Sequence, residues 1–159
     1  MIRVLFVCLG NICRSPMAEA IFRDKVKKAG LETEIEVDSA GTGDWHIGNP
    51  PHEGTIAILD RNNVKHTGIT ARQVKSKDLT DYDFIIGMDA SNIGNIDKLK
   101  VKGTTETGEI SRLLDFTPEK AVADVPDPYF TGNFDEVYDL INDACEKLFV
   151  HILENKKVK

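Results

Sequence analysis

The alternation of apolar and polar positions along the chain predicts strands that are separated by helices. Residues 2–8 are almost continuously apolar, which is typical of a central parallel strand covered on both faces. A second buried strand is predicted at residues 83–88, a short one at 35–38, and a weaker candidate at 110–114. These segments predict an α/β fold with a single open parallel sheet of about four strands and helices on both faces.

Helical spacing of apolar residues follows the first strand and dominates the end of the chain. Ser15 and Pro16 open the first predicted helix, in which Ser15 can serve as the N-cap, and Gly30 ends it. The last helix is the clearest, because Asn133 and Glu136 form a capping pattern ahead of one apolar face. The residues of that face are Phe134, Val137, Tyr138, Ile141, Ala144, Cys145, Leu148, Phe149 and Ile152.

The strands and helices together predict one domain. Two further helices are expected at about residues 52–61 and near residues 92–99, and a Gly- and Pro-rich loop is expected at 39–51. The length of 159 residues suits a single domain, and no linker of Pro, Gly or Ser divides the chain. We expect the domain to comprise residues 1–155 and the last four, 156–159, to form a flexible tail.

The charge balance excludes several classes of function. A net charge of −6 and an isoelectric point near 5.2 argue against a nucleic-acid-binding protein and against a basic membrane-surface protein. Such a surface does not attract anions through its overall field. If the chain acts on an anionic substrate, a local site must bind it.

Cysteine usage favours a reducing compartment. The three cysteines are an odd number, and Cys8 and Cys13 lie in one short segment, which is a poor disulfide framework for a secreted domain. Residues 1–8 lack a cleavage site of small residues, so we interpret them as a buried strand and not as a signal peptide. No apolar run approaches the ~20 residues that span a bilayer. We therefore expect a cytoplasmic protein without a membrane partner.

The turn after the first strand carries the candidate chemistry. Residues 8–15 read C-L-G-N-I-C-R-S and join the carboxyl end of a strand to the start of a helix. Ligands of open α/β sheets bind at such strand ends, and the free N–H groups of a helix start favour a phosphate or a similar oxyanion. Arg14 adds a planar, bidentate clamp for two oxygens. The sequence therefore predicts a phosphate-binding loop after the first strand.

Cys8 and Asp127 are the candidate reacting groups. The donors that bind an oxyanion would also stabilise a thiolate on Cys8, which would then be a nucleophile aimed at phosphorus. The alternative is a small buried cysteine that ends a strand. Asp127 lies between Pro126 and Pro128 on a stiff loop and is suited to act first as a general acid and then as a general base. An isolated Asp-Pro pair is commonly a simple turn, so Asp127 gains meaning only beside the cysteine loop.

These motifs resemble the low-molecular-weight protein tyrosine phosphatase family. The resemblance rests on Cys-x5-Arg-Ser within residues 7–16 and on Asp-Pro-Tyr at 127–129. Residues 38–43, 71–73 and 88–92 also resemble family segments, in the family's order. The similarity therefore spans nearly the whole chain, and the paired terminal motifs are its specific part.

The resemblance implies hydrolysis of phosphotyrosine, and of aryl phosphates, through a phosphocysteine intermediate and without a metal or cofactor. Cys8 would attack phosphorus, Arg14 and the loop amides would bind the phosphoryl oxygens, and Asp127 would protonate the phenolate and then activate water. Ser39 matches a position that supports the loop. The remaining substrate-binding positions implied for the loop are Leu9, Gly10, Asn11, Ile12, Cys13 and Ser15.

The family also places aromatic side chains at the positions of Trp45 and Tyr129, as walls of the pocket. An aromatic slot would favour phosphotyrosine over the shorter phosphoserine; the alternative for Trp45 is packing of its loop onto the domain. In the family a cysteine at position 13 can pair with the nucleophile Cys8 on oxidation and so protect it. The alternative for Cys13 is a buried small residue, and Cys145 is interpreted as core.

One departure from the family concerns histidine. Many members carry a His shortly before the Ala-Arg-Gln segment, whereas residues 68–70 here are Gly-Ile-Thr and the nearest histidine is His66. We do not transfer the role of that His. The other three, His46, His52 and His151, are interpreted as surface or satisfied residues.

Three alternative functions compete with this interpretation, and the first of them, arsenate reduction, uses the same Cys-x5-Arg loop. An arsenate reductase of this architecture needs further cysteines, and none lies between residues 14 and 144. A phosphocysteine carrier has little need of a clamping Arg14 or a general acid. Intact Cys8, Arg14 and Asp127 argue against a phosphotyrosine-binding module with a dead site. The predicted partners are phosphotyrosine proteins or peptides, with inorganic phosphate as product; we expect mostly monomer, with a weak dimer left open.

Overall fold

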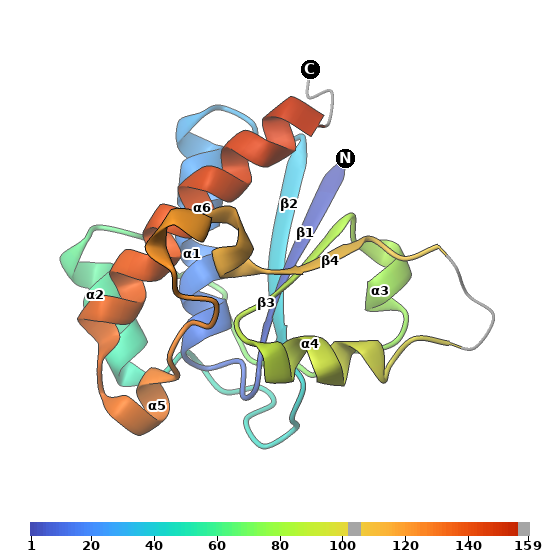
Figure 1. The fold of residues 1–159 in the computed structure, drawn as a ribbon. Helices are drawn as coiled ribbons and strands as arrows, with labels where there is room; N and C mark the ends of the chain where they lie inside the picture. The colour runs from blue at the N-terminus through green and yellow to red at the C-terminus, as the bar shows by residue number, and fades with distance from the viewer. Residues whose placement is uncertain (102–105, 156–159) are drawn as a thin grey trace.

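A four-stranded parallel sheet forms the centre of the protein (Figure 1). The computed structural model describes residues 1–101 and 106–155, and the predicted tail at 156–159 lies outside the described residues. The strands, in the spatial order β2-β1-β3-β4, confirm the predicted fold class. They are β1 (Ile2–Cys8), β2 (Ile35–Gly41), β3 (Phe84–Gly87) and β4 (Glu109–Arg112).

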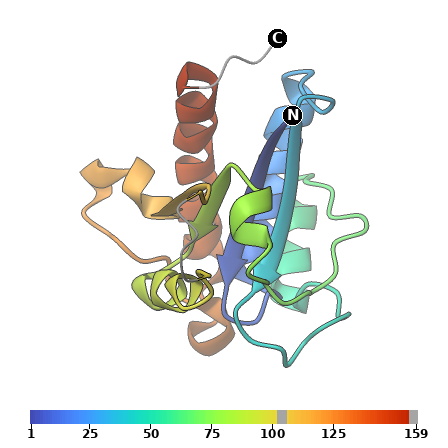
Figure 2. The same ribbon diagram turned by 90° about the vertical axis from the view of Figure 1, so that its right-hand side faces the viewer.

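Helices cover both faces of this sheet, as Figure 2 also shows. Helices α1 and α6 cover one face, with α2 packed against both, whereas α3 and α4 cover the other face. No helix in the described part of the chain is long and apolar enough to cross a bilayer. The helical segments are α1 (Arg14–Lys28), α2 (Glu53–Arg61), α3 (Asp78–Asp81), α4 (Ala90–Asp97), the 3-10 turns η1 (Leu113–Phe116) and η2 (Pro118–Lys120), α5 (Pro128–Thr131) and α6 (Phe134–Asn155).

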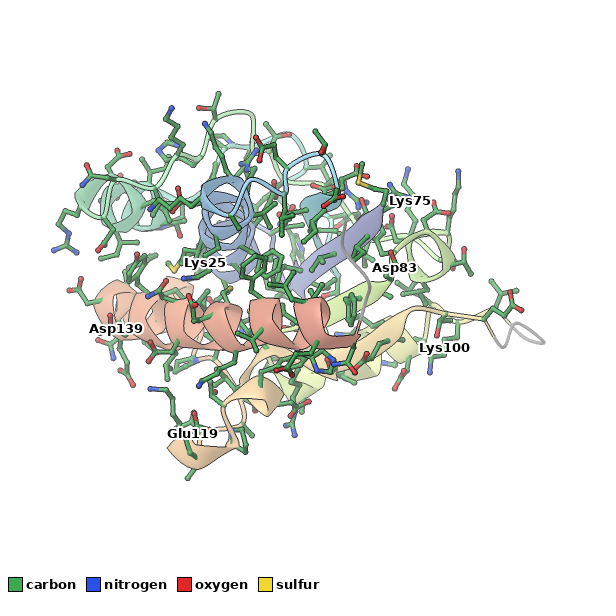
Figure 3. The ribbon with its side chains drawn as sticks, turned by 90° about the horizontal axis from the view of Figure 1, so that it is seen from above. Lys25, Lys75, Asp83, Lys100, Glu119 and Asp139 are labelled. Atoms are coloured by element: carbon green, nitrogen blue, oxygen red, sulfur yellow. The ribbon has the colours of Figure 1, made fainter. Side chains whose placement is uncertain are left out.

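The two faces of β1 explain its continuous apolar run. Val4 and Phe6 belong to the core under α1 and α6, and Leu5 and Val7 belong to the core under α3 and α4. Successive side chains of a strand point to opposite faces, so a strand covered on both sides has no place for an exposed polar residue. The long helices α1 and α6 lie side by side, and Lys25, labelled between them in Figure 3, bonds Glu146 at 2.9 Å.

The first helix begins differently from the sequence prediction. Its N-cap is Cys13, so Ser15 lies inside the first turn and does not cap the helix. Pro16 occupies the third helical position, where its missing N–H leaves no intrahelical bond unmade. Gly30 has a φ of +72° and ends the helix, as predicted. The hydroxyl of Ser15 is thereby free for contacts with the loop before the helix.

Two other boundaries differ from the prediction and bear on the loop. The strand predicted at 35–38 continues as β2 to Gly41, so that Ser39 lies beside Phe6 of β1 and Gly41 beside Cys8. Helix α4 begins at Ala90 and not near residue 92, because Asp89 forms a capping box ahead of it. Both changes bring polar residues to the carboxyl ends of the strands, where the loop lies.

Candidate active site

The loop of residues 8–13 joins β1 to α1 and lies against the end of β2. The N–H of Thr42 donates to the Cys8 carbonyl at 2.9 Å, just beyond the last paired residues of β1 and β2. Gly41 is required at this contact, because a Cβ there would lie 2.8 Å from the Leu9 carbonyl oxygen. The neighbouring strand therefore fixes the backbone of the loop.

Asn11 is the centre of a hydrogen-bond network beneath the loop. Its φ of +56° places it in the left-handed region, which Asn tolerates better than most residues. Its Nδ2 donates to Ser15 Oγ at 2.7 Å and to Ser39 Oγ at 2.9 Å, and its Oδ1 accepts from the N–H of Arg72 at 2.9 Å. One side chain thus joins the loop, α1, β2 and the Ala-Arg-Gln segment.

The sulfur of Cys8 lies among hydrogen-bond donors. The N–H of Asn11 donates to Sγ at 3.3 Å, and Ser15 Oγ lies 2.9 Å from it. Because Ser15 Oγ already accepts a hydrogen bond from Asn11, its own proton is available to Cys8. This arrangement complements a sulfur that carries negative charge, which is the nucleophilic form of cysteine.

Arg14 is buried and is held mainly through Nη1. Its Nη1 donates to Asp89 Oδ2 at 2.7 Å and to the Val125 carbonyl at 2.9 Å, and its Nη2 lies 3.4 Å from Asp127 Oδ2. Its Nε is buried and has no partner among the described residues. With Nη1 fixed, the N–H of Nε and the N–H of Nη2 that does not face Asp127 can form a planar fork for an oxyanion.

Asp127 reaches the same place from the other end of the chain. It caps the short helix α5, where its Oδ1 accepts from the N–H of Tyr129 at 3.1 Å. Pro126 and Pro128 flank it, and its other carboxylate oxygen faces Arg14. The carboxyl group is therefore oriented by its own backbone and by the guanidinium.

Cys8 and Asp127 line one cavity of about 400 Å³, and Arg14, which does not line it, contacts Asp127. Of the loop residues predicted to bind substrate, Leu9, Gly10, Ile12 and Cys13 line it, whereas Asn11 and Ser15 support the loop from beneath. Its other lining residues are Cys8, Trp45, His46, Asp127, Tyr129 and Phe130.

The mouth of the cavity is aromatic and exposed. Trp45 and Tyr129 have 65% and 53% of their surface exposed, and the structure places both in the predicted wall. His46, which we interpreted as a surface residue, also lines the cavity, with its ring centroid 6.3 Å from that of Tyr129. Phe130 completes the wall and contacts Tyr129 edge to face.

Comparison with known proteins agrees with this geometry. A family model described as "Low molecular weight phosphotyrosine protein phosphatase" matches residues 3–159. The chain belongs to this family. The resemblance inferred from the paired terminal motifs is therefore confirmed.

Individual members of the family resemble the chain along its whole length. The low molecular weight protein-tyrosine-phosphatase YfkJ of Bacillus subtilis (strain 168) is 58% identical over 99% of this chain and 100% of its own. The crystal structure of YfkJ superimposes with a TM-score of 0.94, covering 99% of this chain and 98% of that one. The phosphatase PtpA of Staphylococcus aureus (strain MRSA252) is 43% identical over 100% of this chain and 99% of its own. A solved structure titled as a drosophila arginine phosphatase is 34% identical, with a TM-score of 0.88, over 96% of this chain and 99% of that one.

Glu19 is a buried member of the loop network that the sequence prediction missed. Its side chain is almost enclosed, and its Oε1 accepts from Ser39 Oγ at 2.6 Å. Burial is the largest cause that raises the pKa of Glu19 to about 7. One signal was present in the sequence: Glu19 lies four residues after Ser15, and hence on the same face of α1.

The position of the family histidine is filled by other contacts. His66 pairs with Asp60 at 2.9 Å and not with a residue of the loop network, and Ile69 is buried in the core. The segment is joined to the loop instead through the backbone N–H of Arg72, and Arg72 bonds Asp38 and Asp78 through its guanidinium. This network thus uses backbone and carboxylate groups in a stretch where many family members have an imidazole.

The remaining cysteines differ from Cys8 in their surroundings. All three are free thiols. Burial, with a smaller contribution from Asp127, raises the pKa of Cys13 to about 12, so its thiol remains protonated near neutral pH. Cys145 is fully buried, which raises its pKa further, and its place in the core of α6 agrees with the prediction. Among the described residues, no group of three or more His, Cys, Asp or Glu side chains is placed to hold a metal ion.

Proposed function

We propose that the protein hydrolyses phosphotyrosine in proteins or peptides, and aryl phosphates, through a phosphocysteine intermediate. One observation carries the proposal: Cys8 and Asp127 line one cavity, and the buried guanidinium of Arg14, whose Nε has no partner among the described residues, lies 3.4 Å from the Asp127 carboxylate. This set supplies a nucleophile, an oxyanion clamp and a proton donor. Family membership supports the same reaction.

In the first step, the loop N–H groups and the Arg14 fork hold the phosphoryl oxygens. The Cys8 thiolate attacks phosphorus in line, so the S–P bond forms while the bond from phosphorus to the phenolic oxygen breaks. The protonated carboxyl group of Asp127 gives its proton to the departing oxygen. The products of this step are tyrosine and phosphocysteine.

In the second step, the Asp127 carboxylate accepts a proton from a water molecule whose oxygen attacks phosphorus. The S–P bond breaks, inorganic phosphate leaves, and the thiolate of Cys8 returns. The hydroxyl of Ser15, which lies 2.9 Å from the sulfur, stabilises this thiolate as the leaving group. A general acid facing the clamping arginine supports a hydrolase over a phosphocysteine carrier or an inactive binding module.

Substrate class follows from the walls of the cavity. The exposed rings of Trp45 and Tyr129 offer flat apolar contact to a phenyl ring. Aromatic faces also attract a guanidinium, and one related structure is titled an arginine phosphatase. The decisive comparison is therefore among phosphotyrosine, phosphoserine and phosphoarginine.

The test is a rate measurement on matched peptides that differ only in the phosphorylated residue, with EDTA present. We expect the largest kcat/KM for phosphotyrosine, and we expect Cys8→Ser to abolish turnover while phosphate still binds. Faster hydrolysis of phosphoarginine would overturn the substrate class, and activity retained in Cys8→Ser would overturn the mechanism. Cys145→Ser is the matched control, because this thiol lies in the core away from the cavity.

We also propose that the protein acts in the cytoplasm and mostly as a monomer. Three free thiols, one of them the nucleophile, are suited to a reducing compartment. A single chain contributes every group that the proposed mechanism uses. Sedimentation across a range of concentrations tests the monomer, and cell fractionation tests the compartment.

A further inference from the structure

A second cavity, of about 240 Å³, adjoins the proposed active site. We call it the side cavity. Leu9 and Trp45 line both cavities, so the two share a wall. The rest of the side cavity comes from Thr42 and Gly43 after β2, from the segment that follows the Ala-Arg sequence, and from Asn95 and Leu99 at the end of α4. It thus opens beside the phosphate-binding loop and takes no part in the proposed chemistry.

The side chain of Trp45 lies between the two cavities and lines both of them. Its ring lies directly on the backbone of Gly43, where an added Cβ would come within 2.0 Å of the indole. A residue other than glycine at position 43 would therefore push the ring aside. The indole is also largely exposed, so a bound polypeptide can contact it on the way from one cavity to the other.

The lining of the side cavity is neutral. None of its lining residues carries a charge, although the chain as a whole has a net charge of −6. Leu9 and Leu99 supply apolar surface and Asn95 supplies an amide, and the hydroxyl of Thr42 is buried without a hydrogen-bond partner among the described residues. A charged side chain placed here would lose hydration without gaining an ion pair. An aliphatic side chain has little hydration to lose, and an amide can regain hydrogen bonds from Asn95 or the Thr42 hydroxyl.

We propose that the side cavity binds an uncharged side chain of the substrate that lies close in sequence to the phosphotyrosine. The inference rests on the proposed function and adds a specificity determinant to it. A phosphotyrosine within a polypeptide continues into chain on both sides at the cavity mouth. An extended chain advances ~3.3–3.6 Å per residue, so a residue within about three positions of the phosphotyrosine can pass the edge of Trp45.

The test uses phosphotyrosine peptides in which each of the three positions on either side is replaced in turn by Leu, Gln, Asp or Lys. At one position, we expect kcat/KM for Leu or Gln to exceed that for Asp or Lys by about tenfold. Asn95→Asp adds a carboxylate to the wall with almost no change of shape. At the peptide position that shows this preference, we expect the Asn95→Asp variant to favour Lys, with its turnover of p-nitrophenyl phosphate unchanged.

Two further variants keep the test decisive. Val101→Asp adds the same charge at a site that is 57% exposed and outside the side cavity, and it should leave the peptide ranking unchanged. Leu99→Ala enlarges the cavity without adding charge and should raise kcat/KM for a further peptide that carries Phe at that position, relative to the Leu peptide. Equal rates for all peptides, or a ranking that Asn95→Asp alters no more than Val101→Asp does, would overturn the side-cavity assignment. A wild-type protein that fails to hydrolyse p-nitrophenyl phosphate would overturn the proposed function instead.

Discussion

Beneath the loop of the proposed active site, Asn11, Arg14 and Ser15 are buried and joined to their neighbours by hydrogen bonds, whereas at the mouth of the cavity Trp45 and Tyr129 lie exposed. These side chains are held in one arrangement by their hydrogen bonds, and the Nε of Arg14 is the buried donor among them that is left without a partner. The rings of the mouth come from the loop that holds Trp45 and from the short helix α5 that holds Tyr129, and both rings are exposed. The comparison separates the residues expected to set the rate from those expected to select the substrate.

With Cys8 intact, a large loss is expected from a change in the oxyanion clamp. Arg14→Lys keeps a positive charge but removes the planar fork, and it leaves Asp89 and the Val125 carbonyl with a poorer partner. We expect kcat/KM for p-nitrophenyl phosphate to fall by about 10²–10³. Arg112→Lys, at a partly exposed arginine that pairs with Asp115, is the matched control and should stay active. A loss of less than about tenfold would remove Arg14 from the clamp.

Asp127→Asn tests the proton donor. Asparagine keeps the shape and the cap of α5 but has no carboxyl proton to give. For poor leaving groups, turnover should fall by about 10²–10⁴, and the loss should shrink as the leaving group improves. The measurement is kcat across a series of substituted phenyl phosphates. Equal losses along the series would contradict the acid role, and Asp135→Asn, at an exposed carboxylate on α6, serves as control.

At the mouth, smaller and more selective losses are expected. Trp45→Ala should lower kcat/KM for phosphotyrosine peptides by about tenfold, through lost aromatic contact, and change the free energy of unfolding by less than ~0.5 kcal/mol. Ile47→Ala, at an exposed residue of the same loop, should change neither quantity. Peptide kinetics measure the change in kcat/KM, and chemical denaturation measures the change in the free energy of unfolding. A large loss of stability in Trp45→Ala would mean that the ring holds the loop.

The smallest effect on the rate at neutral pH is expected for Glu19→Gln, whose main effect is on stability. In the folded protein the pKa of Glu19 is raised to about 7, so between about pH 4.5 and 7 the folded state binds more protons than the unfolded state. The contribution of protonated Glu19 to the free energy of unfolding is therefore fully present below about pH 4.5 and is lost as the pH rises through about 7. In the wild type, the free energy of unfolding should fall as the pH rises from about 4.5 to 7. We expect Glu19→Gln to make that fall smaller by about 2–3 kcal/mol.

Urea unfolding at several pH values measures the Glu19 effect. Glu32→Gln, at an exposed glutamate, is the control and should follow the wild-type curve. Parallel curves for wild type and Glu19→Gln would show that the carboxyl group stays ionised across this range. Such a result would also remove Glu19 from the set of groups whose protonation bears on the loop of the proposed active site.

Much of the fold could be predicted, because the residues that decide it act locally. The continuous apolar run of β1 indicates a buried strand, and the helical spacing of apolar residues in α6 indicates a helix. Both elements were predicted closely. The start of α1 was not. Ser15 has the side chain of a good N-cap, but its hydroxyl bonds Asn11 and Cys8. Local propensity does not reveal such a contact, since the partner becomes available only when the loop closes.

The site could be predicted in part, for a similar reason. Cys8 and Arg14 are brought together by one short loop, so their spacing alone indicated a shared role. Glu19 and His46 join the site only through tertiary contacts, with Ser39 and with the cavity wall. Their signals in the sequence are weak. A buried glutamate on a helix face and a histidine in a loop are common, and only the folded chain shows what they face.

Asp89 has a further consequence for how the site responds to a substrate. One of its carboxylate oxygens accepts from the N–H of Asn92 at 2.8 Å and caps α4, and the other accepts from Arg14 at 2.7 Å. The guanidinium that we propose as the phosphoryl clamp is thus oriented by a helix start before a substrate arrives. Little reorganisation energy is then needed when charge develops in the transition state, because the dipoles already point the right way. The same Asp89 carboxylate that caps α4 therefore also orients the Arg14 guanidinium.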